Sequence, residues 1–68
     1  MNFSKNLEIL MKKHNINNNQ LSIKLNIDRT NITKYLKGKG NPSLETLEKL
    51  TQIFNCSYDD LLSDNEVK

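Results

Sequence analysis

A chain of 68 residues forms one small domain, with no room for a catalytic module or an effector pocket beside its core. Its single cysteine, Cys56, excludes an internal disulfide, and we expect a half-buried thiol in a reducing cytoplasm. The longest apolar run, from Ile9 to Met11, is too short for a signal peptide or a membrane span, so we expect stability to come from aliphatic helix packing.

The formal net charge is only +2, but the charges are distributed unevenly. Residues 1–42 hold eight basic and two acidic residues, whereas residues 43–68 hold two basic and six acidic ones. Five of the ten basic residues fall between Lys24 and Lys39. Such polarity orients a small protein in the field of a polyanion with its basic half leading, and it favours a nucleic-acid footprint.

The first element is a helix over about residues 3–14, because Phe3, Leu7, Leu10 and Met11 form one apolar stripe. Asn15 and the asparagines at 17–19 then end it. No strand pattern or internal repeat appears in the sequence.

Four further helix starts share one signature, a capping residue preceded by a residue that can pack onto the first turn. Gln20 and Asp60 stand where capping-box partners are expected. These signals predict helices over about 18–25, 29–37, 44–54 and 58–62. The caps are Asn17, Asp28, Ser43 and Ser57.

The helix ends are also marked. Asn26 stands where a left-handed residue is needed after the second helix, Gly38 ends the third, and residues 40–42 turn the chain into the fourth. The predicted core stripe of the fourth helix is Leu44, Leu47, Leu50, Ile53 and Phe54. We expect a domain over residues 1–62 and a polar, frayed tail over 63–68.

The helix at 29–37 has an apolar side, formed by Ile32, Tyr35 and Leu36, and an opposite side with hydroxyls, cations and no acid. Such a face suits the DNA major groove, where an arginine pairs with guanine and a threonine methyl meets thymine. For Arg29, a phosphate contact or a salt bridge to Asp28 is the alternative. The expected base-reading residues are Arg29, Thr30, Thr33 and Lys34.

The pattern as a whole resembles the lambda-repressor-like helix-turn-helix domains of the XRE/Cro family of phage and bacterial transcriptional regulators. The resemblance covers about residues 3–62 and rests on Ser22, Asn26, Ile32 and Tyr35 and on the segments 35–39 and 41–47. It implies an all-α, compact five-helix fold in which the second and third helices form the helix-turn-helix. Met11 and Leu36 depart from it together, because they stand where the family often has an arginine and a glutamate, and they fit apolar packing in place of a buried ion pair.

The resemblance also implies a set of contacts to the DNA backbone. Asn18 starts the second helix, where the family commonly has a glutamine. Asn31 is added from its own position at the edge of the polar face of the third helix, and the alternative is that it only serves the start of that helix. The expected phosphate-binding residues are Asn18, Asn31, Lys37, Lys39 and Asn41.

The expected function is therefore sequence-specific binding of double-stranded DNA by a cytoplasmic, nucleoid-associated regulator, a repressor in our interpretation. One recognition helix reads too few base pairs to select a genomic site, so we expect a homodimer on an inverted-repeat operator, completed on the DNA. Its interface would lie at the acidic end; the alternative is that Tyr58 and Leu62 only close the monomer's core. The expected interface residues are Tyr58, Leu62, Val67 and Asn55.

The alternative function is that of an antitoxin-like or other protein-interaction module. In such a module, the exposed face of the third helix should carry aromatic or aliphatic residues. No enzyme, metal, cofactor or small-molecule ligand is expected. The only histidine, His14, stands at a helix end beside lysines and is best explained as a solvated cation or cap. Asp59 and Asp60 are adjacent, so they point about 100° apart on a helix and cannot act as a catalytic pair.

Overall fold

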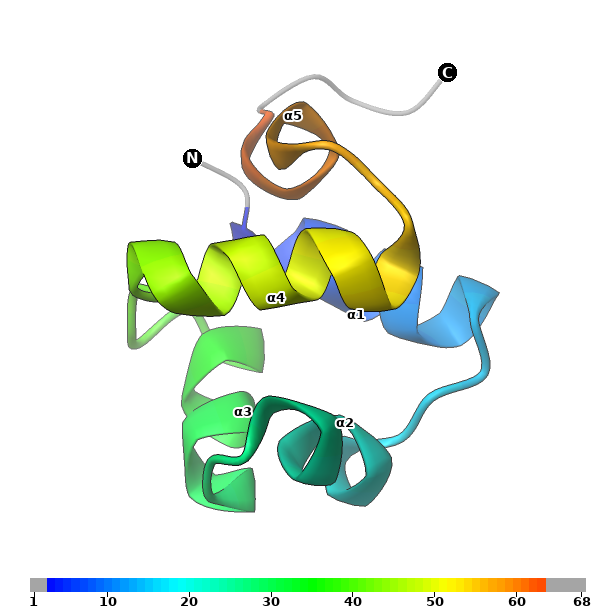
Figure 1. Cartoon of the computed structure of the whole chain (residues 1–68). Helices are drawn as coiled ribbons and strands as arrows, with labels where there is room; N and C mark the ends of the chain where they lie inside the picture. The colour runs from blue at the N-terminus through cyan, green and yellow to red at the C-terminus, as the bar shows by residue number, and fades with distance from the viewer. Residues whose placement is uncertain (1–2, 64–68) are drawn as a thin grey trace.

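The computed structural model describes residues 3–63, and within that range the chain forms five α-helices and no strand. The helices are α1 (Phe3–Lys13), α2 (Asn18–Leu25), α3 (Arg29–Leu36), α4 (Leu44–Phe54) and α5 (Tyr58–Leu62). Helix α4 crosses in front of α1, with α5 on one side of this pair and α2 and α3 on the other (Figure 1). The expected five-helix fold is confirmed.

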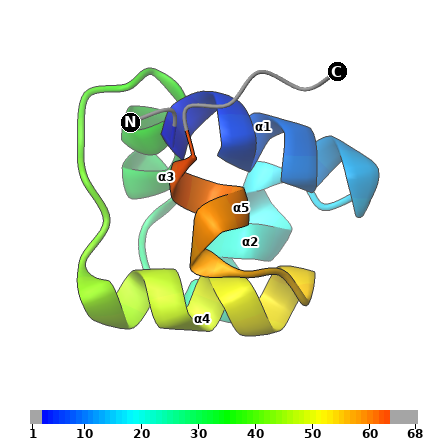
Figure 2. The same ribbon diagram turned by 90° about the horizontal axis from the view of Figure 1, so that it is seen from above.

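The core lies where these helices meet. All four apolar positions of the α1 stripe are buried, as predicted. Helix α5 lies between α1 and α4 when the domain is viewed from above (Figure 2). Its single buried residue, Leu61, belongs to the core. The buried apolar residues are Phe3, Leu7, Leu10, Met11, Leu21, Leu25, Ile32, Leu47, Leu50, Phe54 and Leu61.

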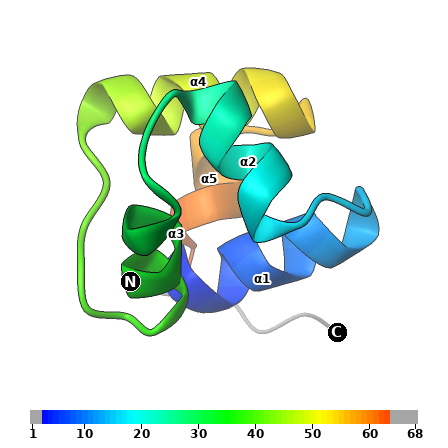
Figure 3. The same ribbon diagram turned by 90° about the horizontal axis from the view of Figure 1, so that it is seen from below.

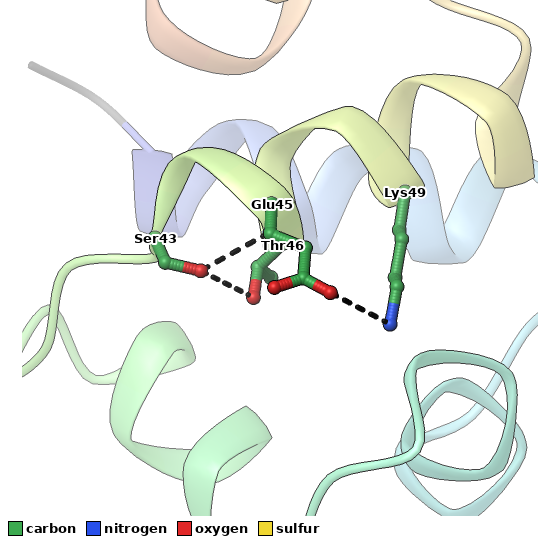
Figure 4. A network of polar contacts seen from close by, with 4 residues as sticks. All are labelled: Ser43, Glu45, Thr46 and Lys49. Carbon is green, nitrogen blue, oxygen red and sulfur yellow. Dashed lines mark hydrogen bonds and ion pairs between the residues drawn. The ribbon is translucent and has the colours of Figure 1, made fainter.

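Three of the four predicted caps hold their helices by a side-chain hydrogen bond. The Asn17 side chain accepts from the Gln20 amide, and Ser57 accepts from the Asp60 amide; both form complete capping boxes. At the start of α4, the Ser43 hydroxyl accepts from the Thr46 amide at 3.2 Å and donates to its hydroxyl at 3.0 Å (Figure 4).

Asp28 is the exception among the caps. It has the extended backbone of an N-cap residue, but its carboxylate makes no capping hydrogen bond to α3. The predicted N-cap position at Asp28 is confirmed, but the side-chain hydrogen bond expected of an N-cap residue is absent. The exposed carboxylate still favours α3 through its charge, because the N-terminal end of a helix dipole is positive.

Left-handed residues follow four of the five helices, as the sequence predicted at Asn26 (φ 60°) and Gly38 (φ 73°); α5 ends instead at the extended Ser63. Asn15 and Asn55 have φ of 58° and 51°, so asparagine also occupies the left-handed positions after α1 and α4. Two predicted helices are shorter by one residue each, α1 before Asn15 and α3 before Gly38. Helix α1 ends at Lys13 rather than residue 14, and α3 ends at Leu36 rather than residue 37.

Leu44 corrects the predicted core stripe of α4. Its side chain is 74% exposed, whereas Leu47, Leu50 and Phe54 are buried and Ile53 is half-buried. At about 100° per residue, Leu44 lies about 90° around the helix from the centre of the buried stripe. Glu45 and Lys49 form an exposed ion pair on the same helix, at 3.8 Å (Figure 4).

The attachment of α5 depends on a side chain that the sequence pattern did not single out. The Asn6 amide nitrogen on α1 donates to the carbonyls of Leu61 and Ser63, at 2.9 and 3.0 Å. These carbonyls lie at the C-terminal end of α5, where a helix lacks internal donors. These hydrogen bonds from Asn6 attach α5 to α1. They therefore stabilise a five-residue helix that is too short to be stable alone.

The left-handed backbone at Asn26 gives the first prediction. Asn26→Ala should lower the free energy of unfolding by about 1–2 kcal/mol, because a Cβ-bearing residue without a local polar group is strained there. Asn26→Gly should retain or raise the stability. Urea denaturation followed by circular dichroism measures both. Asn19→Ala, at an exposed position inside α2, is the matched control and should change stability by less than about 0.5 kcal/mol; equal losses from both alanines would contradict the prediction.

Candidate nucleic-acid interface

Helix α3 is attached to the domain by its apolar side. Ile32 is fully buried, and Tyr35 and Leu36 are half-buried against the core. The Tyr35 ring meets the Phe3 ring of α1 edge to face, with centroids 5.5 Å apart. This packing fixes the rotation of α3 about its axis. Its opposite side therefore faces outward, as the sequence predicted.

The outward side of α3 carries the four expected base-reading residues. Arg29, Thr30 and Lys34 are exposed, and Thr33 is half-buried. Arg29 makes no ion pair within residues 3–63, so the alternative that Asp28 binds it is not realised here. Its guanidinium is available to a ligand.

Asn18 lies beside these residues although it belongs to another helix. Asn18, Arg29, Thr30 and Thr33 line one shallow hollow of about 360 Å³ between the start of α2 and the outer side of α3. Viewed from below, α2 and α3 lie side by side and form this face (Figure 3). The buried Ser22, whose hydroxyl donates to the Asn19 carbonyl at 2.8 Å, is small enough to suit that close packing.

The other expected phosphate-binding residues lie around α3. Asn31, Lys37, Lys39 and Asn41 are all exposed. Lys37 caps α3, and the left-handed Gly38 turns the chain so that the Lys39 amide donates back to the Lys34 carbonyl at 2.9 Å. The amide and cationic side chains expected to bind phosphate thus lie between the start of α2 and the loop after α3. Their contact with DNA stays a prediction.

The charges also separate in space. Helix α5 carries the acids Asp59 and Asp60 and lies on the opposite side of the α1–α4 pair from α3 (Figure 1). Helix α3 and its C-terminal loop carry Arg29 and three lysines. A polyanion therefore meets the α3 side at a lower electrostatic cost than the α5 side.

The expected dimer residues lie at the α5 end. Tyr58 is 45% exposed and Asn55 is exposed. Leu62 is half-buried and packs against the core, so for this residue the alternative of closing the monomer's core is partly realised. Val67 lies outside the described residues.

Met11 and Leu36 line a second, larger hollow, of about 570 Å³, between the end of α1, the start of α2 and the end of α3. Met11 is buried and Leu36 is half-buried. The two apolar side chains therefore share one environment, as their joint departure from the family pattern suggested.

Cys56 and His14, the two residues whose side chains could be reactive, lie against core or partly buried residues. The thiol of Cys56 is half-buried, and burial, followed by the negative charge of Asp60, raises its pKa, so it stays protonated at neutral pH. The exposed His14 ring lies beside the Phe54 ring, with the two ring centroids 5.3 Å apart.

Within residues 3–63, no cluster of three His, Cys, Asp or Glu side chains is arranged to hold a metal. None of the five helices has the length and apolar character needed to cross a membrane.

Comparisons with known proteins support the expected fold and family. Residues 6–66 match the family described as the Cro/C1-type HTH DNA-binding domain. The chain is 36% identical over 67 residues to the HTH-type transcriptional activator BcrR of Enterococcus faecalis, covering 98% of this chain and 33% of that protein. It is 33% identical over 67 residues to the HTH-type transcriptional regulator ImmR of Bacillus subtilis strain 168, covering 98% of this chain and 53% of that protein.

A solved structure is also similar. A transcriptional regulator from Listeria innocua superposes with a TM-score of 0.85 at 30% identity, over 97% of this chain and 62% of that one. The chain thus spans between about a third and two thirds of the length of these three proteins.

The second prediction concerns the exposed cation at the end of α3. Lys37→Ala should weaken binding to all duplexes alike and reduce the slope of log K against log salt by about one unit, because one phosphate contact and its released counterion are lost. Titrations at several salt concentrations measure the slope. Lys13→Ala removes the same charge from α1, beside the α4–α5 turn, and should leave the slope unchanged. An unchanged slope in Lys37→Ala would remove this residue from the interface.

Proposed function

Since the chain belongs to the Cro/C1-type HTH family of DNA-binding domains, we propose that it binds double-stranded DNA sequence-specifically and regulates transcription, with α3 in the major groove. Arg29, Thr30, Thr33 and Lys34 read base edges in this proposal. Asn18, Asn31, Lys37, Lys39 and Asn41 bind the phosphate backbone and fix the position of α3.

The outward side of α3 carries this proposal. The exposed side chains of α3 carry cations, hydroxyls or an amide. Its apolar residues lie on the other side, where Ile32 is buried and Tyr35 contacts Phe3. A protein-binding helix would instead present aromatic or aliphatic side chains on that side. The hollow shared by Asn18 and the first turn of α3 adds a second argument, because it combines a potential phosphate ligand with potential base readers on one surface.

We further propose that two copies bind an inverted repeat with half-site centres about 34–36 Å apart, one turn of DNA. The contact between them would be formed at the acidic α5 end, around Tyr58 and Asn55 with Leu62 at its edge. The negative charges of α5 would keep free chains weakly associated, so the dimer is completed on the operator.

Repression is the simplest outcome of such binding, because occupation of a promoter by itself excludes other proteins from the same DNA. The relative from Enterococcus faecalis is named an activator, and the sign of regulation distinguishes the two outcomes. A promoter fusion that carries the selected operator, in bacterial cytoplasm with and without this chain, gives that sign.

The third prediction tests base reading and begins with selection of preferred sites from a random DNA library. Arg29→Ala should lose about 1–3 kcal/mol of binding free energy on the selected site and should no longer discriminate at one G·C pair, because a bidentate guanine contact is removed. Binding curves on the site and on its single-pair variants measure both effects. A uniform loss on every sequence would assign Arg29 to the backbone, and failure to select any site would refute the proposed function.

The fourth prediction tests assembly. Sedimentation with an inverted-repeat operator should give two chains per site at saturation. Tyr58→Ser should leave binding to an isolated half-site unchanged and should let one-chain complexes accumulate on the full site, because the contact between the two chains is weakened. Leu44→Ser, which changes an exposed apolar residue at the start of α4, is the control. A single chain per inverted repeat at saturation would refute the dimer.

A further inference from the structure

The hydroxyl of Thr33 already has a partner inside the protein. Its Oγ1 donates to the main-chain carbonyl of Arg29, one turn earlier in α3, at 3.2 Å. A threonine hydroxyl has one proton, so this bond uses the only donor that the side chain carries. Such a bond to the preceding turn is common for threonine in helices.

Thr33 nevertheless lies at the candidate interface. It lines the hollow that also contains Asn18, Arg29 and Thr30. The side chain has two groups on Cβ, and the hydroxyl is turned back to the helix. The methyl is therefore the group that can meet a base without breaking the intrahelical hydrogen bond.

Thr30, in the same hollow, differs in this respect. Its side chain is exposed, and its hydroxyl has no hydrogen-bond partner within residues 3–63. The two threonines are thus not equivalent. Thr30 retains a donor and an acceptor, whereas Thr33 offers a methyl and a lone pair.

We propose that Thr33 is a thymine reader, which selects the base through contact between its methyl and the C5-methyl of thymine in the major groove. This inference rests on the proposed function. Arg29 and Thr33 are four residues apart on one side of α3, about 6 Å along its axis. With base pairs spaced about 3.4 Å apart, the thymine lies within about two base pairs of the guanine that Arg29 reads.

The test replaces thymine by uracil, one position at a time, in the selected operator. Uracil lacks only the C5-methyl group and pairs as thymine does. Wild-type protein should lose about three- to fourfold in affinity at one position near the Arg29 guanine, the factor that corresponds to one buried methyl group. Replacement of thymines outside the half-sites controls for changes in the duplex itself.

Two variants separate the methyl from the hydroxyl. Thr33→Ser keeps the hydroxyl and removes the methyl, so it should bind the thymine and uracil operators equally. Thr33→Val keeps a methyl and removes the hydroxyl, so it should retain the discrimination. Thr51→Ser is the matched control, because Thr51 of α4 also donates to a carbonyl of its own helix, at 2.6 Å from Glu48, and lies outside the hollow. It should change neither affinity nor discrimination.

Several results would overturn the proposal. Equal binding of thymine and uracil operators by wild-type protein would do so, as would selected sites without a thymine near that guanine. Discrimination retained in Thr33→Ser would assign the thymine to another residue. Discrimination lost in Thr33→Val, with the melting temperature unchanged, would assign the reading to the hydroxyl. In all four cases specific DNA binding persists, which distinguishes failure of this inference from failure of the proposed function.

Discussion

The packing of α3 onto the rest of the domain is the constraint on which the candidate interface depends. Ile32 is fully buried, the Tyr35 ring meets the Phe3 ring edge to face, and Leu36 lines a hollow together with Met11 of α1. An eight-residue helix has little stability of its own, so these contacts hold α3 in its helical form as well as in its orientation. Because the apolar side is anchored, the polar side is presented as a rigid surface.

The start of α2 is the second part of that surface. A complete capping box at Asn17 and the left-handed turn at Asn26 define both ends of α2, and the small, buried Ser22 suits its close packing beside α3. The side chain of Asn18 is thereby held next to the first turn of α3. A loop in the same place would lose conformational entropy on binding, whereas a capped helix has already lost it.

Polarity of charge connects the fold with its proposed assembly. The acids of α5 and the cations around α3 are separated by the α1–α4 pair, and Asn6 holds the end of α5 in place. The α3 end of the domain is thus suited to a polyanion, and the α5 end is where the proposed contact with a second copy would form. In the proposed dimer, an interface at the acidic end would carry like charges on both chains, and their repulsion would keep the chains weakly associated off DNA.

The sequence by itself determined the helix boundaries to within one residue and the outward side of α3. Local signals carry this information: side-chain caps, left-handed asparagine or glycine residues, and apolar spacing act within a turn or two of the chain. Helix starts at Asn18, Leu44 and Tyr58 were predictable for that reason.

Only the tertiary structure decided which neighbours those helices meet. Periodicity included Leu44 in the core stripe, yet no other element covers that side of the first turn of α4 sufficiently to bury it. The hydrogen bonds from Asn6 to α5 span more than fifty residues of sequence, and the hollow shared by Asn18 and Thr33 joins two helices. Such contacts depend on the distances and crossing of helices, which a local pattern does not specify. The same holds for Thr33. The sequence predicted that this residue lies on the outward side of α3, but only the structure showed that its hydroxyl donates a hydrogen bond to the Arg29 carbonyl.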